Sequence, residues 1–451
     1  MAKVNKLFAG FGRANITPPM GIDVAGYFKV RKADGVLDEL EVNAVALKVE
    51  ENTVLLITVD HCGIVKPIVD GFKAEITQKT GVSGDNIFIH ATHTHTAPTM
   101  IVDTDDILIN EYITFVSHKV ADASLFAIED LKPAKMGYGV STAPGIAFVR
   151  RFRMKDGSVK TNPGVGNPDI LAPIGDVDER VNVLRFTRDG ADDIVLANFG
   201  DHPDTVGGNK ISGDWPSLTR ATFEKAVDNT KCIFFNGAQG DVNHVKVNPT
   251  PGDFNGMFHD FDGCSRGYAH AIYMGRVVAG AIMQIYDKVN YVDVDELKSV
   301  QVLVDIPSNK ATPDQLPEAH RINDLHNAGR DSELPYEGMM LTTIVAEAAR
   351  MVRLENAPDV KPMLFSAVKV GNIALFGIPG EPFTGIGRGI KEAEGWDLVL
   401  PVCQTNAKEG YFPMQDAYDE GGYEARSSNF KAGVAELIIK EGKKILSDLR
   451  K

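Results

Sequence analysis

Cysteine is scarce in this 451-residue chain. The four that occur, Cys62, Cys232, Cys264 and Cys403, lie far apart and form no CxxC pair. This spacing argues against a disulfide framework and against a zinc site built from thiolates. Cys232 and Cys403 lie within apolar runs, KCIFFN and LVLPVC, and are predicted to be core residues.

Basic residues are also in deficit, since 47 Lys and Arg face 61 Asp and Glu and give a formal net charge of −14. Nucleic acids and anionic membranes attract basic patches, so neither is expected as the main partner. No apolar stretch approaches the roughly 20 residues that span a bilayer, so no transmembrane segment is expected. The first residues, MAKVNKLFAGFGRANITPP, lack the features of a signal peptide. A cytoplasmic protein is therefore expected, or a secreted one if a leader has been trimmed.

Two motifs of common enzyme classes are missing as well. Segment 234–244, FFNGAQGDVNH, lacks the GK[ST] ending of a P-loop and is not a GxSxG elbow. It does run from an apolar strand into a glycine-containing turn, whose backbone N–H groups can bind an anion or an oxyanion. Gly240 and Asp241 are the residues expected to contact substrate there. The structural alternative is an ordinary tight turn between a strand and a loop.

What the sequence does contain is an interleaving of strand and helix patterns, which is typical of an α/β fold. Runs of apolar and β-branched residues predict strands at 44–49, 54–59, 86–90, 182–186, 194–199, 231–235, 299–304, 363–370, 373–377 and 398–403. Apolar residues spaced three and four apart predict helices at 69–80, 106–131, 217–227, 267–289, 339–354, 383–393 and 430–449. Short turns at 50–52 and 371–372 add antiparallel pairs.

Two long segments rich in Gly, Pro, Asn and Asp, 154–178 and 245–263, are predicted to be loops. Loops of this length within a compact chain are uncommon and often wall an active site. Strand and helix patterns resume directly after both, so neither is an interdomain linker. One catalytic domain spanning residues 1–451 is predicted.

The segment NIFIHATHTHTAP, residues 86–98, carries the strongest chemical signal. A short strand ends in His90, and His93 and His95 follow two residues apart, so in extended chain they point the same way. Imidazoles so placed can share a metal ion, or divide metal binding and proton transfer between them. The alternative is a set of hydrogen-bonded loop histidines.

Three further apolar runs end in polar residues at their carboxyl ends, which is where ligands collect in open α/β sheets. They lead to His202 in GDHPD, to Glu381 in IPGEP, and to Tyr411 in the loop that follows LVLPVC. Each has a structural alternative: a capped loop histidine, a first-turn helix acid and a packed aromatic. Together they provide oxygen and nitrogen ligands that suit Zn²⁺.

With these segments in view, the chain resembles the catalytic domain of the neutral/alkaline non-lysosomal ceramidase family. The resemblance rests on short stretches in the family's order: FGRANITPP, ATHTHTAP, NFGDHPD with ISGDWPS, NGAQGDVN, GIPGEPF and GYFPMQDAYDEGGYEAR. It implies a core of two mixed or antiparallel β-sheets flanked by helices. It also implies a zinc-dependent hydrolase that cleaves a linear amide with a hydroxide generated on the ion.

Carried over by position, the resemblance assigns the zinc ligands to His93, His202, Glu381 and Tyr411. It makes His95 the acid/base residue beside the metal.

It also places Tyr423 near the substrate carbonyl and Arg150, which precedes Arg151, in contact with substrate. Family members that act on ceramide carry a serine at the position of Asn243, and that serine is proposed to take part in the reaction. Asn243 could polarise or position the same group that the serine does. The extra C-terminal domain of well-studied members has no counterpart after the predicted helix 430–449. Lys155 and Lys160 make segment 154–178 polar, which favours a smaller and more polar amide than ceramide.

Two other functions use the same residues. A metal-dependent ester or phosphoester hydrolase would favour a second metal. The spare candidate ligands for that second metal are Asp60, His61, Asp201, Asp204 and Asp241. A binding protein without turnover is the other alternative, and Asn243 would then mark the lost activity. The expected partner in all cases is a small-molecule or lipid-like compound, and a homo-oligomer is compatible with the sequence.

Overall fold

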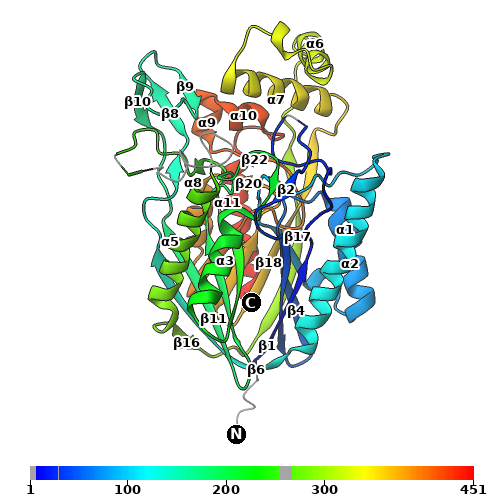
Figure 1. The fold of residues 1–451 in the computed structure, drawn as a ribbon, viewed down its shortest axis with the longest axis vertical. Helices are drawn as coiled ribbons and strands as arrows, with labels where there is room; N and C mark the ends of the chain where they lie inside the picture. Colours follow the sequence, from blue (N-terminus) through cyan, green and yellow to red (C-terminus); the bar gives the residue numbers. More distant parts are fainter. Residues whose placement is uncertain (1–6, 29, 251, 254–266) are drawn as a thin grey trace.

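In the computed structural model, two β-sheets packed face to face form the centre of the chain (Figure 1). The structure describes residues 7–28, 30–250, 252–253 and 267–451. Cys264 and most of the predicted loop 245–263 therefore lie outside the described residues. No helix within the described ranges is long and apolar enough to cross a membrane.

The larger sheet has nine strands in the order β14-β12-β11-β6-β1-β3-β4-β5, with β16 paired to β6. Neighbouring strands are antiparallel except for the parallel pairs β4 with β5 and β12 with β14. The strands are β1 (Leu7–Asn15), β3 (Glu41–Val49), β4 (Asn52–Val59), β5 (Ile87–Ala91), β6 (Lys132–Thr142), β11 (Arg180–Arg188), β12 (Asp193–Phe199), β14 (Thr230–Asn236) and β16 (Asn290–Val292).

The smaller sheet has four strands in the order β17-β18-β19-β21, of which β19 and β21 are parallel. They are β17 (Leu297–Pro307), β18 (Val360–Val370), β19 (Ile373–Gly377) and β21 (Leu398–Val402). The inner faces of the two sheets meet in one apolar cluster that includes Leu56, Phe88 and Phe235 from the first and Leu375 and Leu400 from the second. Burial on both faces explains why these strands read as continuous apolar runs.

Helices cover the outer face of each sheet, which gives four layers (Figure 1). On the larger sheet lie α1 (Lys66–Thr80), α2 (Ile107–Glu129), α3 (Asp214–Ala226) and α5 (Tyr268–Tyr286). On the smaller sheet lie α8 (Thr384–Lys391) and α11 (Val434–Arg450). The predicted α/β architecture of two sheets flanked by helices is confirmed.

A further group of elements gathers at the end of the molecule opposite to β16 (Figure 1). Among them are α6 (Leu316–Asn327), α7 (Gly338–Leu354), α9 (Gln415–Glu420), α10 (Tyr423–Ser427), and the sheet of β8 (Arg151–Met154), β9 (Val159–Thr161) and β10 (Ile170–Pro173). Three two-stranded pairs join them: β2 (Gly35–Val36) with β13 (Lys210–Ile211), β7 (Phe148–Val149) with β15 (Val242–Asn243), and β20 (Glu381–Pro382) with β22 (Tyr411–Phe412). Two 3₁₀ turns are η1 (Gly84–Asn86) and η2 (Asp331–Glu333).

Some elements were not predicted from the sequence. Segment 154–178, predicted as one loop, contributes to the sheet of β8, β9 and β10, and no prediction covered β1, β6 or α6. Strand β1 contains Gly10 and Gly12, which interrupt the run of apolar residues by which a strand is predicted. These glycines are required by close packing, since a Cβ atom on either would lie 2.0 Å from a backbone oxygen of α2.

Candidate functional site

Four separate strands direct the predicted site residues to one place. β5 leads into the loop with His93 and His95, and β12 leads to His202. β19 leads to Glu381 in β20, and β21 leads to Tyr411 in β22. Since β20 pairs in parallel with β22, Glu381 lies opposite Tyr411. The carboxyl ends of strands from both sheets therefore meet, as expected for a ligand site in an α/β fold.

Three of these side chains form a compact triangle of potential donor atoms. His93 Nε2 lies 3.1 Å from His202 Nε2 and 3.3 Å from Glu381 Oε2. His202 Nε2 lies 3.7 Å from the same carboxylate oxygen. All three residues are buried, with exposed fractions of 6% or less. A set of two imidazoles and one carboxylate is a known ligand set for zinc.

The other ring nitrogen of each histidine faces a backbone carbonyl. His93 Nδ1 contacts the oxygen of Cys62, and His202 Nδ1 lies 3.1 Å from the oxygen of Gln239. A carbonyl can only accept a hydrogen bond, so each Nδ1 carries a proton, and Nε2 is the ring nitrogen left to bind a metal. Partners of this kind orient metal-binding histidines.

These residues fit a bound cation. Two Nε2 lone pairs facing each other repel unless a positive charge lies between them. Tetrahedral ligands about 2.0–2.1 Å from a metal are roughly 3.3 Å apart, close to the separations in the triangle. Glu381 Oε2 is buried and accepts no hydrogen bond from any described residue. Although burial opposes the charge, Glu381 and Cys62 raise the pKa of His93 to about 10, so without a metal a proton on Nε2 supplies that positive charge.

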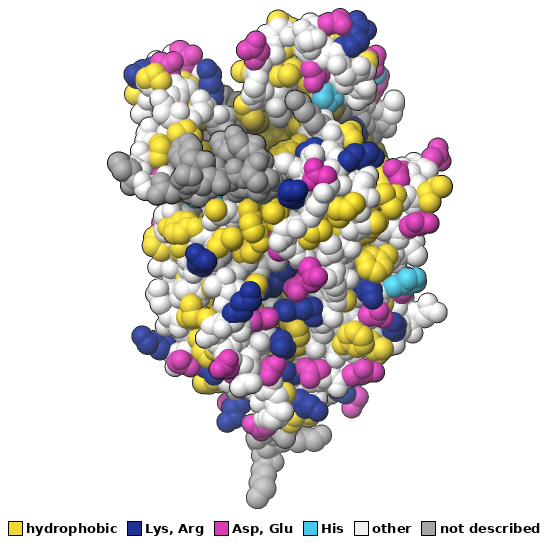
Figure 2. Space-filling view, in the orientation of Figure 1, with side chains coloured by type: hydrophobic (Ala, Val, Ile, Leu, Met, Phe, Trp, Pro, Cys, Tyr) yellow, Lys and Arg dark blue, Asp and Glu magenta, His cyan; other side chains and the backbone are white. Residues whose placement is uncertain are grey.

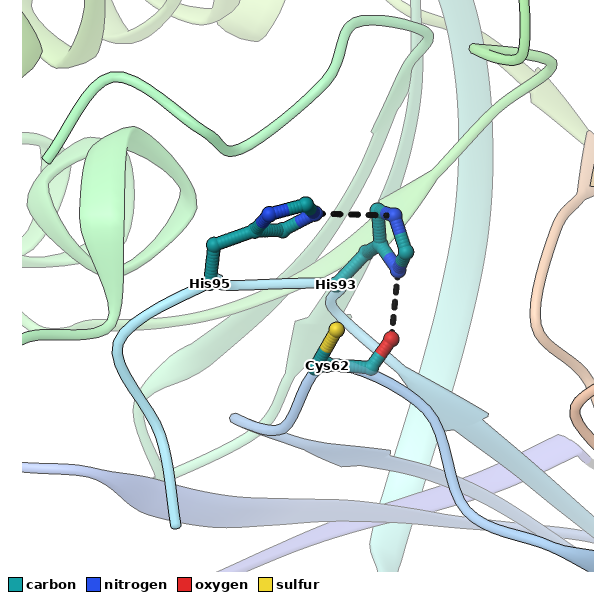
Figure 3. A group of neighbouring side chains, drawn as sticks. All are labelled: Cys62, His93 and His95. Atoms are coloured by element: carbon teal, nitrogen blue, oxygen red, sulfur yellow. Dashed lines mark hydrogen bonds between the residues drawn. The ribbon is translucent and has the colours of Figure 1, made fainter. Parts of the chain in front are cut away.

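His95 lies beside the triangle (Figure 3). Its Nε2 atom is 3.3 Å from His93 Nε2, and its Nδ1 atom is 3.8 Å from an oxygen of Asp204. His95 belongs to a second group of potential ligands, with Cys62 and His93, and not to the group that contains Glu381. His95 is thus near the candidate metal position and also near a carboxylate that can stabilise its protonated form.

Cys62 is a site residue that the sequence analysis did not identify. Its buried thiol lies next to His93 and His95, as Figure 3 shows. Burial opposes ionisation of the thiol, but Lys408 and His93 lower its pKa. The available signal was its place just after β4, since β4 and β5 are parallel and end at the same edge.

Tyr411, Tyr423 and Arg150 pack together on the other side of the triangle. The Tyr411 ring is stacked on His202 with a centroid separation of 6.5 Å, and it meets the Tyr423 ring at 5.6 Å. The guanidinium of Arg150 lies 5.3 Å from the centre of the Tyr411 ring. Burial raises the pKa of Tyr411 well above its usual value, with Arg150 opposing that rise.

Of the two adjacent arginines, Arg150 is the one that lines a cavity at the site. Its Nε atom lies 2.7 Å from Glu424, and its Nη2 atom donates to the backbone oxygen of Gly240. Arg151 instead pairs with Glu420 at 3.1 Å.

Gly240 and Asp241, predicted to contact substrate, use their polar groups within the protein. The Gly240 N–H donates to the Pro382 oxygen at 2.8 Å, so it is engaged and does not point at an oxyanion. Asp241 Oδ1 accepts from the backbone N–H and the hydroxyl of Thr384, at 2.7 and 2.8 Å, near the start of α8. Their contact with substrate stays a prediction.

Asn243, which replaces the family's serine, is also hydrogen-bonded inside the protein. Its amide donates to Asn162 Oδ1 at 2.9 Å, and its carbonyl accepts from the N–H of Val245 at 3.0 Å. Asn162 itself lines a cavity at the site, so Asn243 lies one residue behind that wall.

The carboxylates considered for a second metal do not gather into a site within the described residues. Asp60 forms a buried ion pair with Arg220 at 2.6 Å, and Asp241 is bound to Thr384. Among the described residues, the two groups that could hold an ion both contain His93.

Two adjoining cavities meet at the reacting side chains, and both are lined by Gly26, Tyr27 and Phe28. Cavity A, about 460 Å³, has an apolar wall made by Val30, Met339, Leu341 and Val345, and it is also lined by the charged side chains of Arg31 and Arg150. Cavity B, about 390 Å³, reaches His93 and Glu381 and is walled by Cys62, Ala346, Ala349, Arg353, Lys408 and Asn429.

His95, Tyr411 and Tyr423 line both cavities. Lys155 and Lys160 lie on the exposed surface and are not among the described residues that line them, so the reason for expecting a polar substrate is lost.

No protein-family model matches this sequence, and a search of curated proteins finds no match either. Solved structures do match in three dimensions. The neutral ceramidase from Pseudomonas aeruginosa superposes with a TM-score of 0.74 at 18% identity, covering 99% of this chain and 75% of that one. A structure described as ceramidase complexed with C2 gives a TM-score of 0.73 at 16% identity, with the same coverage. The resemblance seen in the sequence is thus confirmed at the level of the fold.

Proposed function

Since this chain has the fold of neutral ceramidase and brings a His–His–Glu triangle to the ends of its strands, we propose that it is a zinc-dependent hydrolase of a linear N-acyl amide. The overall reaction adds water across the C–N bond and releases a carboxylic acid and an amine. The observation that carries the proposal is the triangle itself, whose donor atoms are 3.1, 3.3 and 3.7 Å apart.

In this proposal His93, His202, Glu381 and Tyr411 hold the metal. When bound, Zn²⁺ supplies polarisation of a carbonyl group and lowers the pKa of a water molecule to about 7. The backbone carbonyls of Cys62 and Gln239 keep His93 and His202 in the tautomer that binds a metal.

His95 acts as the general acid and base. It lies beside the triangle but outside the group that contains Glu381, so it takes a proton at one ring nitrogen and passes it to the leaving amine. Asp204, 3.8 Å from its Nδ1 atom, stabilises the charged ring.

Tyr423 and Arg150 orient the carbonyl group and stabilise negative charge on its oxygen. Arg150 is held in place by Glu424 and by the Gly240 oxygen, so its orientation is set before substrate binds. Donors arranged in advance in this way typically contribute about 3–4 kcal/mol to transition-state stabilisation.

Metal analysis followed by a substrate screen tests the proposal. Purified protein is expected to hold about one equivalent of zinc, to lose amidase activity in a chelator and to regain it with added Zn²⁺. The substrates are N-acyl compounds that range from ceramides to N-acetylated sugars. Two equivalents of metal with phosphoester cleavage would favour the phosphoesterase, and a zinc-loaded protein without turnover would favour the binding protein.

A further inference from the structure

Two cations, Lys408 and Arg353, line cavity B together with the Glu381 carboxylate. Lys408 lies in the loop between β21 and β22, and Arg353 lies in the last turn of α7. Within the described parts of the chain, neither forms an ion pair with Asp or Glu. Both side chains are exposed, so they can meet a ligand that enters the cavity from solvent.

The surrounding residues keep both cations available. Glu409, which follows Lys408 in the chain, pairs with Lys361 instead. Arg353 Nη2 donates to Asn429 Oδ1 at 2.6 Å, a neutral partner that orients the guanidinium without cancelling its charge. Desolvation lowers the pKa of Arg353, and no carboxylate offsets this effect.

Helix α7 connects this cationic region to an apolar one. Thr342, Val345, Ala349 and Arg353, spaced three or four residues apart, form one face of the helix that lines the two cavities. Val345 faces cavity A and Arg353 faces cavity B, and eight residues of helix separate them by about 12 Å.

The two cavities therefore meet at the reacting side chains. Met339, Leu341 and Val345 give cavity A an apolar wall, and Lys408 and Arg353 give cavity B a cationic one. His95, Tyr411 and Tyr423 border both cavities. Figure 2 shows a hollow near the top of the molecule in this view, with hydrophobic side chains exposed along it. A linear molecule lying across the centre would place one end among apolar groups and the other beside two positive charges.

Building on the hydrolase function above, we propose that the substrate is an N-acyl compound whose amine part carries a carboxylate, as in an N-acyl amino acid. Its acyl chain occupies cavity A, and its carboxylate binds Lys408 and Arg353 in cavity B. Hydrolysis would then release a fatty acid and an amino acid. Charge-assisted hydrogen bonds to a carboxylate are about twice as strong as neutral ones, so they provide the selectivity.

The test compares N-decanoylglycine with N-decanoylethanolamine, which have the same acyl chain and similar length but differ in charge. The wild-type zinc enzyme is expected to show a kcat/KM at least about tenfold higher for the glycine compound. In the double variant Lys408→Gln/Arg353→Gln this ratio should fall toward one. Lys440→Gln, which removes an exposed lysine of α11 outside both cavities, should keep the ratio.

Calorimetric binding of the same two compounds to zinc-free protein should rank them in the same order, which provides a readout independent of turnover. Thermal melts of each variant would check that it is folded. Equal kcat/KM values for the two compounds in the wild type would overturn this inference and leave the hydrolase function standing. So would a preference for N-octylsuccinamate, which carries its carboxylate on the acyl side. Cleavage of none of these amides, nor of any other linear amide by the zinc-loaded protein, would instead overturn the hydrolase function.

Discussion

His93 is held in an uncommon backbone conformation. Its φ of 78° lies in the left-handed region that non-glycine residues rarely adopt, and Gln404, whose side chain approaches His93, has a φ of 44°. Such conformations persist where the surrounding structure enforces them, and they concentrate at functional sites. Here they turn the chain sharply after β5, so that two histidines both face the centre.

The proposed roles of the two histidines predict different losses on mutation. His95→Ala should keep its zinc and lose kcat by roughly 10²–10⁴-fold, because it removes proton transfer alone. His93→Ala removes a ligand and should lower zinc affinity by at least about tenfold. Metal content by plasma mass spectrometry and turnover are measured on both variants. Loss of zinc from His95→Ala would show that His95 is a ligand.

A substitution at Gly240 tests whether close packing against the backbone of Glu381 supports the metal site. A Cβ atom at Gly240 would lie 2.6 Å from the backbone oxygen of Glu381, which cannot move without moving the ligand. Gly240→Ala should therefore lower the free energy of unfolding by about 1–3 kcal/mol and weaken zinc binding.

The matched control is Gly71→Ala in α1, where nothing lies within 4 Å of the added Cβ. It should stabilise the protein by about 0.5–1 kcal/mol. Urea unfolding and zinc titration measure both changes, and normal zinc affinity in Gly240→Ala would contradict the proposed coupling.

At the scale of elements, two carboxylates meet at the start of α3: buried Asp214 within the helix, and half-buried Asp38 from the segment after β2. Burial raises the pKa of Asp214 to about 7, with Asp38 contributing, although three backbone N–H groups oppose the rise. Burial likewise raises the pKa of Asp38 to about 6. Asp38 accepts a hydrogen bond from the N–H of Gly213, so both carboxylates hold the segment that leads into α3.

These shifts predict a pH dependence of stability. Between about pH 4 and pH 7 the folded protein retains a proton on Asp214 that the unfolded chain releases, because the folded pKa lies above the ordinary value of 3.8. The free energy of unfolding should therefore fall as pH rises through this window. Asp214→Asn should flatten the decrease, measured by urea unfolding at pH 5, 6 and 7. Asp359→Asn, at an exposed carboxylate, is the control, and an unchanged slope in Asp214→Asn would refute the assignment.

Elements differ in how far the sequence predicted them. β3, β4, β12 and β19 were predicted because burial on both faces makes each an unbroken apolar run. β1 was not predicted because its glycines are required by close packing against α2, and the local pattern of apolar residues does not show that contact.

At the scale of the whole molecule, the candidate ligands come from both sheets. His93 and His202 follow strands of the nine-stranded sheet, and Glu381 follows a strand of the four-stranded sheet. A metal bound by all three would link the two sheets directly. Its binding energy would then contribute to global stability, because an unfolded chain cannot bring these residues together.

Zinc removal should accordingly lower the melting temperature, and added zinc should restore it. At free zinc one hundred times the dissociation constant, the stabilisation is about 2.7 kcal/mol. Differential scanning calorimetry with and without chelator measures the shift. Glu381→Gln, which keeps the shape of the side chain and removes its charge, should lose most of this zinc response. An equal response in both proteins would place the metal elsewhere.

The sequence by itself determined the α/β class, the pair of histidines two residues apart, and the polar residues that follow apolar strands. All of these are local patterns, set by the two-residue repeat of a strand and by the burial of each run. The tertiary structure alone decided which strand ends meet, and so which side chains lie within 4 Å of one another. The tertiary structure also decided that the Gly240 N–H bonds to the Pro382 oxygen and that Cys62 lies beside His93 and His95. It brought Arg353 and Lys408 to the same cavity. Those outcomes depend on pairing between residues hundreds of positions apart, and no local pattern records that pairing.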